Sequence, residues 1–253
     1  MADLRGKLYL STTADDAPFL AREHGLGLEI AEFCTASNMD RGFAAADRLV
    51  RENMTGVGRF TFHAPFNELS PAAIDPLVKE IAFHRYRQAI DLAPRYGAKK
   101  IVVHSGFIPR IYFPSWFVKQ SIPFWREILQ TTPEDVTLCL ENVMEPGPEM
   151  LMEIVEGVAD PRFRLCLDVG HAACMGKNIS VEQWIRTMGE NIGHLHLHNN
   201  DCISDLHQCL GEGILDMNSI LSALETCCPE ATMTIENIHA ADSVRWLRDQ
   251  NYL

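Results

Sequence analysis

Hydrophobic and polar positions follow two alternating periods along the chain, one typical of buried strands and one typical of amphipathic helices. Short apolar runs rich in β-branched and aromatic residues predict strands over 7–12, 27–33, 59–64, 99–105, 136–141, 162–168, 193–198 and 231–236. Between them, helical spacing predicts helices over 15–24, 43–52, 75–96, 116–129, 148–158, 181–191, 217–227 and 241–251. Three helices begin beside a residue suited to capping, namely Asp15, Ser180 and Asp216.

Eight strand–helix units of about 32 residues each predict a parallel sheet closed into a (β/α)8 TIM barrel, an α/β fold. An open, doubly wound sheet is the structural alternative. It usually carries a glycine-rich turn after its first strand, and residues 10–18 (LSTTADDAP) contain no glycine. No linker or low-complexity tract divides the sequence, so we expect one domain over 1–253.

Residue types that bind metals recur at the carboxyl ends of the predicted strands, about one per strand–helix unit. Parallel strands of a barrel direct these ends to one rim, so the side chains should meet in space. A single strand-end histidine or carboxylate is more often a cap or a loop contact than a ligand, but the recurrence favours a shared site. The residues are His63, His104, Glu141, Asp168, His171, His196 and Glu236.

Histidine and carboxylate ligands without clustered thiolates favour Zn²⁺, Mn²⁺, Co²⁺ or Fe²⁺. His194, His196 and His198 alternate with leucines and therefore share one face of a strand. We expect His196 to be the ligand and His194 to lie deeper as a buried, hydrogen-bonded histidine. Asp205 and His207 follow in a loop that can fold back over the rim.

These segments resemble the xylose-isomerase-like TIM barrels, a superfamily that joins sugar and sugar-phosphate isomerases and epimerases with endonuclease IV. The resemblance is strong from about residue 60 to the end and weak before it. It rests on HAPF (63–66), VVHSG (102–106), LEN (140–142), LDVGHA (167–172), HLHLHNND (194–201), DLHQCLGEG (205–213) and IEN (235–237).

The resemblance implies two possible ligand sets, for one ion or for as many as three. Single-metal isomerases and epimerases hold their ion with four residues, which correspond here to Glu141, Asp168, His196 and Glu236. Endonuclease IV holds three zinc ions with nine residues, and this chain matches them by adding His63, His104, His171, Asp205 and His207. The single-metal ketose epimerases typically have an arginine where this chain has Asp205 and His207.

The first functional hypothesis is a metal-dependent isomerase or epimerase of a sugar, a sugar phosphate or a related polyol. Glu141 and Glu236 would exchange the proton through an enediolate whose negative charge a divalent ion stabilises. His171 and His198 are expected to orient substrate hydroxyl groups. Arg110 is the candidate phosphate contact, because a planar guanidinium suits phosphate.

The alternative hypothesis is an endonuclease-IV-like phosphodiesterase acting on abasic DNA, which the nine-ligand match favours. The net charge of −12 disfavours a nucleic-acid partner. The loops after strands two and four offer two arginines, Arg41 and Arg110, which are few for contacts to a DNA duplex. The aromatic loop 107–117 fits better as a lid or as a contact between subunits of a homo-oligomer. A barrel that binds without turnover is the least favoured class. With no membrane span and no signal peptide evident, we expect a cytoplasmic protein.

Overall fold

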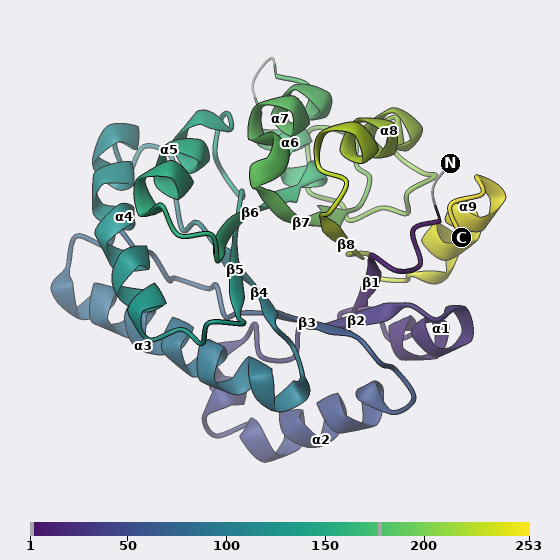
Figure 1. The fold of residues 1–253 in the computed structure, drawn as a ribbon, viewed down its shortest axis with the longest axis horizontal. Helices are drawn as coiled ribbons and strands as arrows, with labels where there is room; N and C mark the ends of the chain where they lie inside the picture. Colours follow the sequence, from purple (N-terminus) through teal and green to yellow (C-terminus); the bar gives the residue numbers. More distant parts are fainter. Residues whose placement is uncertain (1–2, 177–178) are drawn as a thin grey trace.

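Eight parallel strands form a closed barrel in chain order, and helices surround it (Figure 1). The computed structural model describes residues 3–176 and 179–253. The last strand pairs with the first, which closes the sheet and confirms the predicted (β/α)8 barrel over the open alternative. The strands are β1 (Leu8–Ser11), β2 (Gly27–Ile30), β3 (Phe60–His63), β4 (Lys100–His104), β5 (Thr137–Glu141), β6 (Phe163–Asp168), β7 (Ile192–Leu197) and β8 (Thr232–Ile235).

At least one α-helix follows each strand, and some helices differ in their bounds from the predicted ranges. The α-helices are α1 (Ala17–His24), α2 (Phe43–Met54), α3 (Pro76–Leu92), α4 (Pro114–Gln130), α5 (Glu149–Val158), α6 (Val169–Met175), α7 (Val181–Met188), α8 (Met217–Cys227) and α9 (Ala241–Asp249). The 3-10 helices η1 (Ala36–Met39), η2 (Ala93–Tyr96) and η3 (Gly189–Asn191) complete them. The predicted helix 75–96 is therefore α3 continued by η2, and 181–191 is α7 continued by η3. No helix was predicted at α6.

Two of the three expected helix caps are confirmed. Ser180 forms a reciprocal capping box with Gln183 at the start of α7, and the Asp216 carboxylate accepts from the backbone N–H of Ser219 in α8. The expected cap at Asp15 is wrong. Asp16 occupies the N-cap position of α1, and its carboxylate instead accepts from two backbone N–H groups at the start of α9.

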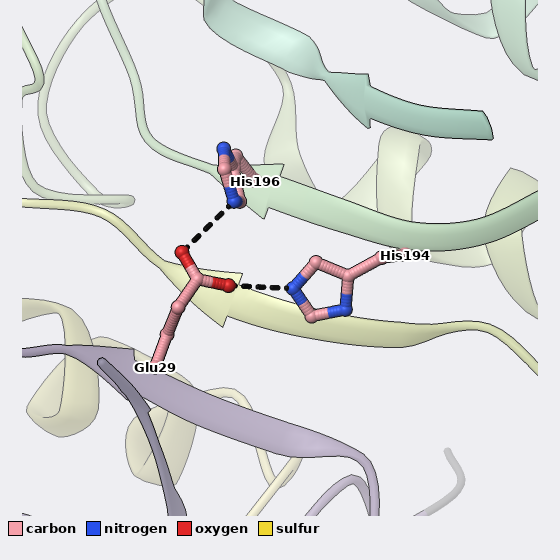
Figure 2. Close-up of side chains that lie close together, drawn as sticks. All are labelled: Glu29, His194 and His196. Carbon is pink, nitrogen blue, oxygen red and sulfur yellow. Dashed lines mark hydrogen bonds and ion pairs between the residues drawn. The ribbon is translucent and has the colours of Figure 1, made fainter. Parts of the chain in front are cut away.

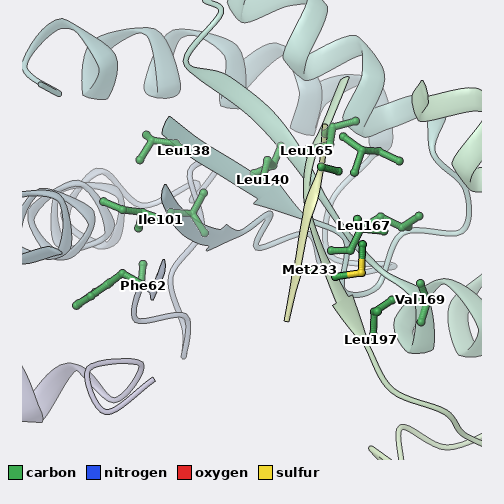
Figure 3. Packing of buried hydrophobic residues seen from close by; sticks show 14 of the residues in the cluster. Phe62, Ile101, Leu138, Leu140, Leu165, Leu167, Val169, Leu197 and Met233 are labelled. Atoms are coloured by element: carbon green, nitrogen blue, oxygen red, sulfur yellow. The ribbon is translucent and has the colours of Figure 1, made fainter. Parts of the chain in front are cut away.

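The main hydrophobic core lies between the outer face of the barrel and the helices. Strand residues that alternate outward, such as Phe62, Ile101, Leu140 and Leu167, are buried in it (Figure 3). Their neighbours in sequence face the barrel interior, where Val102, Cys139 and Cys166 form a separate small apolar cluster. Closer to the carboxyl ends of the strands, the next inward positions are His104, Glu141 and Asp168. The fold therefore places the metal-binding residue types at the carboxyl ends of the strands.

The helices within residues 3–176 and 179–253 include none that is both long enough and apolar enough to cross a membrane.

Candidate metal centre

A cavity of about 470 Å³ opens at the carboxyl ends of the strands. One part of its lining is polar and consists of candidate ligands, namely His63, His104, Glu141, His171, Asp205, His207 and Glu236. The other part is mainly apolar and comes from the segments after β3, β4 and β5. The barrel therefore presents its ligand-type residues to a space of small-molecule size.

Four of the candidate ligands form one compact group at the base of the cavity. Glu141, Asp168, His196 and Glu236 each offer a ligand atom, and the four atoms lie within 4.8 Å of one another. The Nδ1 atom of His196 lies 3.1 Å from Glu141 Oε1, 3.3 Å from Glu236 Oε2 and 3.8 Å from Asp168 Oδ2. One imidazole nitrogen thus faces three carboxylates that come from β5, β6 and the residue after β8.

The second carboxylate oxygen of Glu141 belongs to a neighbouring group. Its Oε2 atom lies 3.4 Å from His63 Nε2 and 3.2 Å from His104 Nε2. Oε2 is buried and has no hydrogen-bond partner among the residues that the structure describes. Glu141 therefore joins two adjoining sets of ligand atoms, one on each oxygen.

A third group lies at the more exposed side of the cavity. Asp205 Oδ2 lies 3.2 Å from His171 Nε2 and 3.1 Å from His207 Nε2. The nine residues that the sequence analysis singled out as candidate ligands therefore form three adjoining groups, and seven of them line the cavity while Asp168 and His196 lie beside Glu141 and Glu236.

Backbone contacts fix the positions of these side chains. The Asn142 side chain accepts from the backbone N–H of Asp168 and donates to its carbonyl, which locks the end of β6 to that of β5. The Asp168 carboxylate also caps α6 by accepting from the backbone N–H of His171. Asn237, which follows β8, donates from its side-chain amide to the carbonyl of His207 in the loop after β7. A loop ligand is thereby tied to the end of β8.

Three histidines share a second feature, a contact between Nδ1 and a backbone carbonyl. His63 Nδ1 lies 2.8 Å from the Ala64 carbonyl oxygen, His171 Nδ1 lies 3.0 Å from that of Asn142, and His207 Nδ1 lies 2.7 Å from that of Glu236. A carbonyl only accepts, so Nδ1 carries the proton in each ring. Nε2 then faces the carboxylates, and it is the nitrogen that would bind an ion once the ion displaces its proton, which is the orientation of metal-ligating histidines.

The charges in the cavity shift the pKa values of its groups strongly. Burial alone would raise the pKa of Glu141, but the neighbouring His196 and His104 hold it well below its usual range. Burial likewise opposes ionisation of Asp168, yet His171 and His198 lower its pKa to about 2. The carboxylates are therefore ionised at neutral pH, as metal ligation requires.

The residues present fit a divalent ion. The donors are imidazole nitrogens and carboxylate oxygens, the buried Glu141 Oε2 atom lacks a hydrogen-bond partner, and no Lys or Arg is among the described residues that line the cavity. Buried carboxylates are costly unless positive charge compensates them. Histidines supply that charge in the metal-free protein, and a divalent ion would take the place of their protons. We therefore assign this cavity as a candidate metal centre.

The histidine pKa values predict that metal binding releases protons. Burial would lower the pKa of His207, but its hydrogen bond to Asp205 and the charge of Glu236 raise it to about 9. An ion must displace that proton, so affinity at this group should rise with pH and level off above about 9. Titration calorimetry at pH 7 in buffers of different ionisation enthalpy should show proton release. Equal heats in all buffers would contradict it.

The residues predicted to bind substrate lie in different places. His171 lines the cavity, and His198 is buried, with its Nε2 atom 3.1 Å from Asp168 Oδ1 and its ring stacked on His207. Arg110 is exposed and is not among the residues that line the cavity. From the aromatic loop 107–117, Phe107 and Tyr112 line the cavity.

Sequence reasoning missed Glu29, which is fully buried in β2 and contacts His194 and His196. The available signal was a carboxylate in the middle of an apolar strand, where an unpaired charge is too costly to keep. His194 is the buried, hydrogen-bonded histidine that the sequence predicted.

Comparison with known proteins places the chain among relatives that share this barrel. Residues 20–250 match the family described as xylose isomerase-like TIM barrel. The chain belongs to this family. A probable endonuclease 4 of Mesomycoplasma hyopneumoniae is 31% identical over 180 residues, which cover 62% of this chain and 61% of that protein. The chain spans about two thirds or less of the length of its first curated relatives.

Solved structures of similar proteins superpose over nearly the whole chain. The TTHB071 protein from Thermus thermophilus, studied after soaking with ZnCl2, is 27% identical with a TM-score of 0.75, covering 96% of this chain and 97% of that one. A D-tagatose 3-epimerase-like protein has the same TM-score at 24% identity, covering 97% and 96%. Other sugar epimerases share the fold at lower identity.

Proposed function

We propose that this protein is a divalent-metal-dependent isomerase or epimerase that acts on a small sugar or related polyol. The observation that carries the proposal is the compact group of Glu141, Asp168, His196 and Glu236 at the base of a cavity of about 470 Å³. Sugar epimerases among the structural neighbours support the same class of reaction. A cytoplasmic location remains a prediction from the sequence.

The reaction requires removing a proton from the carbon beside a carbonyl group and returning one elsewhere or on the other face. Glu141 and Glu236 both line the cavity and lie 3.1 Å and 3.3 Å from His196 Nδ1, and they would serve as the two proton carriers. Glu236 is the better placed of the two, because its side chain is 16% exposed while both oxygens of Glu141 face histidines. His171, at the cavity wall, would orient substrate hydroxyl groups.

Glu141, Asp168, His196 and Glu236 would hold the ion in this mechanism. A divalent ion there supplies positive charge that stabilises negative charge developing on the substrate oxygens. The described lining has no Lys or Arg, and Arg110 is exposed outside it, so an uncharged sugar fits the cavity better than a sugar phosphate.

A metal titration tests the proposal. Metal-free protein is supplied with Mn²⁺, Co²⁺ or Zn²⁺ in steps, and exchange of substrate hydrogen with solvent is followed for a panel of ketoses and aldoses. Exchange should appear with the first ion and saturate near about one equivalent, because the four-ligand group suffices for the reaction. Exchange that appears only after about three equivalents, or never, would contradict the single-ion mechanism.

A second candidate function is phosphodiester cleavage, because the nine candidate ligands lie together in three adjoining groups at the cavity. The similarity to a probable endonuclease 4 supports it. The net charge of −12 and the absence of Lys and Arg from the described cavity lining argue against a DNA substrate. In the same titration, this function predicts cleavage of DNA with abasic sites near about three equivalents of Zn²⁺.

A further inference from the structure

His196 is held differently from the other histidines of the candidate metal centre. His63, His171 and His207 each direct Nδ1 to a backbone carbonyl and Nε2 to a carboxylate of the centre. The ring of His196 is reversed, since its Nδ1 atom faces Glu141 and Glu236. The atom opposite, Nε2, therefore needs a different partner to fix the ring.

That partner is Glu29, which reaches across the barrel interior from β2 (Figure 2). Glu29 Oε1 lies 3.1 Å from His196 Nε2, and both side chains are fully buried. Neither of these two atoms has a hydrogen-bond partner among the residues that the structure describes, so this ion-pair contact is the polar contact available to both. A buried carboxylate oxygen and a buried imidazole nitrogen are each costly to leave alone, so the contact matters to both.

The other oxygen of Glu29 is firmly held. Glu29 Oε2 accepts from Thr61 Oγ1 at 3.2 Å and from Thr234 Oγ1 at 2.9 Å, and it lies 3.0 Å from His194 Nε2. Two hydroxyl donors, with His194 Nε2 shared between Glu29 Oε2 and Thr234 Oγ1, fix the carboxylate in one orientation. Its remaining oxygen then points at His196, as Figure 2 shows.

The donors on Glu29 are ordered in turn by a chain of hydrogen bonds from β4 and β8. Lys100 Nζ, which only donates, lies 2.6 Å from Thr232 Oγ1, and that hydroxyl lies 2.7 Å from His194 Nδ1. The Glu29 carboxylate only accepts, so His194 Nε2 carries a ring proton on the side that faces Glu29 Oε2 and Thr234 Oγ1. His194 Nδ1 is then left to face the Thr232 hydroxyl.

We propose that Glu29 is a positioning residue for the metal ligand His196. Its carboxylate would hold a proton on His196 Nε2 and fix the ring, so that Nδ1, which lies 3.1 Å from Glu141 Oε1, is the nitrogen left for an ion between Glu141, Asp168 and Glu236. A carboxylate behind a ligating histidine is a recurrent way of orienting the ligand. This inference rests on the metal centre of the proposed function, but not on which reaction it catalyses.

Glu29, His194 and His196 are close enough together to hold an ion themselves. Two observations argue against that use. Hydroxyl donors already occupy Glu29 Oε2, and neither Glu29 nor His194 is among the residues that line the cavity. The four-ligand group differs, because two of its members, Glu141 and Glu236, line the cavity.

Replacing Glu29 by glutamine tests the proposal through metal binding alone, with no substrate. The E29Q protein should bind the first equivalent of Co²⁺ about 10–100-fold more weakly than the wild type. The visible absorption band of the bound Co²⁺ should also shift, because His196 is no longer fixed. Wild-type affinity together with an unchanged band in E29Q would overturn the proposal.

Glu145→Gln is the matched control, because Glu145 is also a fully buried carboxylate near the rim. It bonds to Ser105 and to the backbone N–H groups of Val143 and Met144, and burial raises its pKa. E145Q should bind Co²⁺ like the wild type, and an equal loss in both variants would overturn the proposal.

If E29Q does not fold, Thr61→Val takes its place, since it removes a single donor from Glu29 Oε2. T61V should weaken Co²⁺ binding several-fold, and unchanged binding would overturn the proposal. A wild-type protein that binds no Co²⁺ would instead refute the metal centre itself, which separates that failure from the failure of the positioning role.

Discussion

Replacing Glu141 by glutamine is expected to abolish both metal binding at the base of the cavity and proton exchange with a substrate. Glu141 is the residue on which two ligand groups meet, with Oε1 3.1 Å from His196 Nδ1 and Oε2 3.2 Å from His104 Nε2. Glutamine keeps the size but replaces one of these oxygens by an NH₂ group, which cannot bind a cation. We expect metal affinity to fall by at least about 100-fold and exchange by about 10²–10⁴-fold.

Equilibrium dialysis with Co²⁺ and deuterium incorporation from D₂O measure the two effects of E141Q. The companion variant Glu236→Gln should also abolish exchange, because it removes the more accessible proton carrier. Glu236 contacts His196 but not His63 or His104, so E236Q should retain more metal than E141Q does. The E145Q control should keep its exchange activity. Full exchange in either E141Q or E236Q would refute the mechanism with two glutamates.

Replacing Asp205 by asparagine is expected to separate the two candidate functions. Asp205 Oδ2 joins His171 and His207 in the outer ligand group and does not belong to the four-ligand group. The isomerase mechanism needs only the inner group, so D205N should lose the outer ion and keep exchange activity within about threefold. A phosphodiesterase that uses three ions should lose about 10²-fold or more in D205N.

Asp201→Asn is the matched control for D205N. Asp201 lies in the same loop and bonds to the backbone N–H groups of Ile203 and Ser204. Metal content by elemental analysis, together with exchange and phosphodiester assays, measures the outcome in both variants. Loss of exchange in D205N but not in D201N would contradict the single-ion mechanism.

The sequence was sufficient to predict the barrel because its eight units repeat a strong local pattern. It was also sufficient to predict that the candidate ligands lie close together, since the parallel strands of a barrel end at one rim. The short α6 was missed because it begins directly at the end of β6, where Asp168 is both a candidate ligand and the helix N-cap. Its apolar residues are too few to show a helical period.

The role of Glu29 could not be predicted because it depends on contacts between distant parts of the chain. Glu29 and His194 are 165 positions apart, and Thr234 is 205 positions from Glu29. A lone carboxylate within β2 signals a buried partner but does not identify it. The direction of the His196 ring, which decides what that partner does, is likewise set by tertiary packing.

Deuterium incorporation by the wild-type protein tests the central claim most directly. The protein, loaded with Mn²⁺, Co²⁺ or Zn²⁺, is incubated in D₂O with a panel of ketoses and aldoses, and NMR follows the hydrogen on the carbon beside the carbonyl. Our account predicts that at least one sugar exchanges this hydrogen and is converted into an isomer or epimer. No exchange with any sugar, combined with cleavage of DNA at abasic sites, would contradict it.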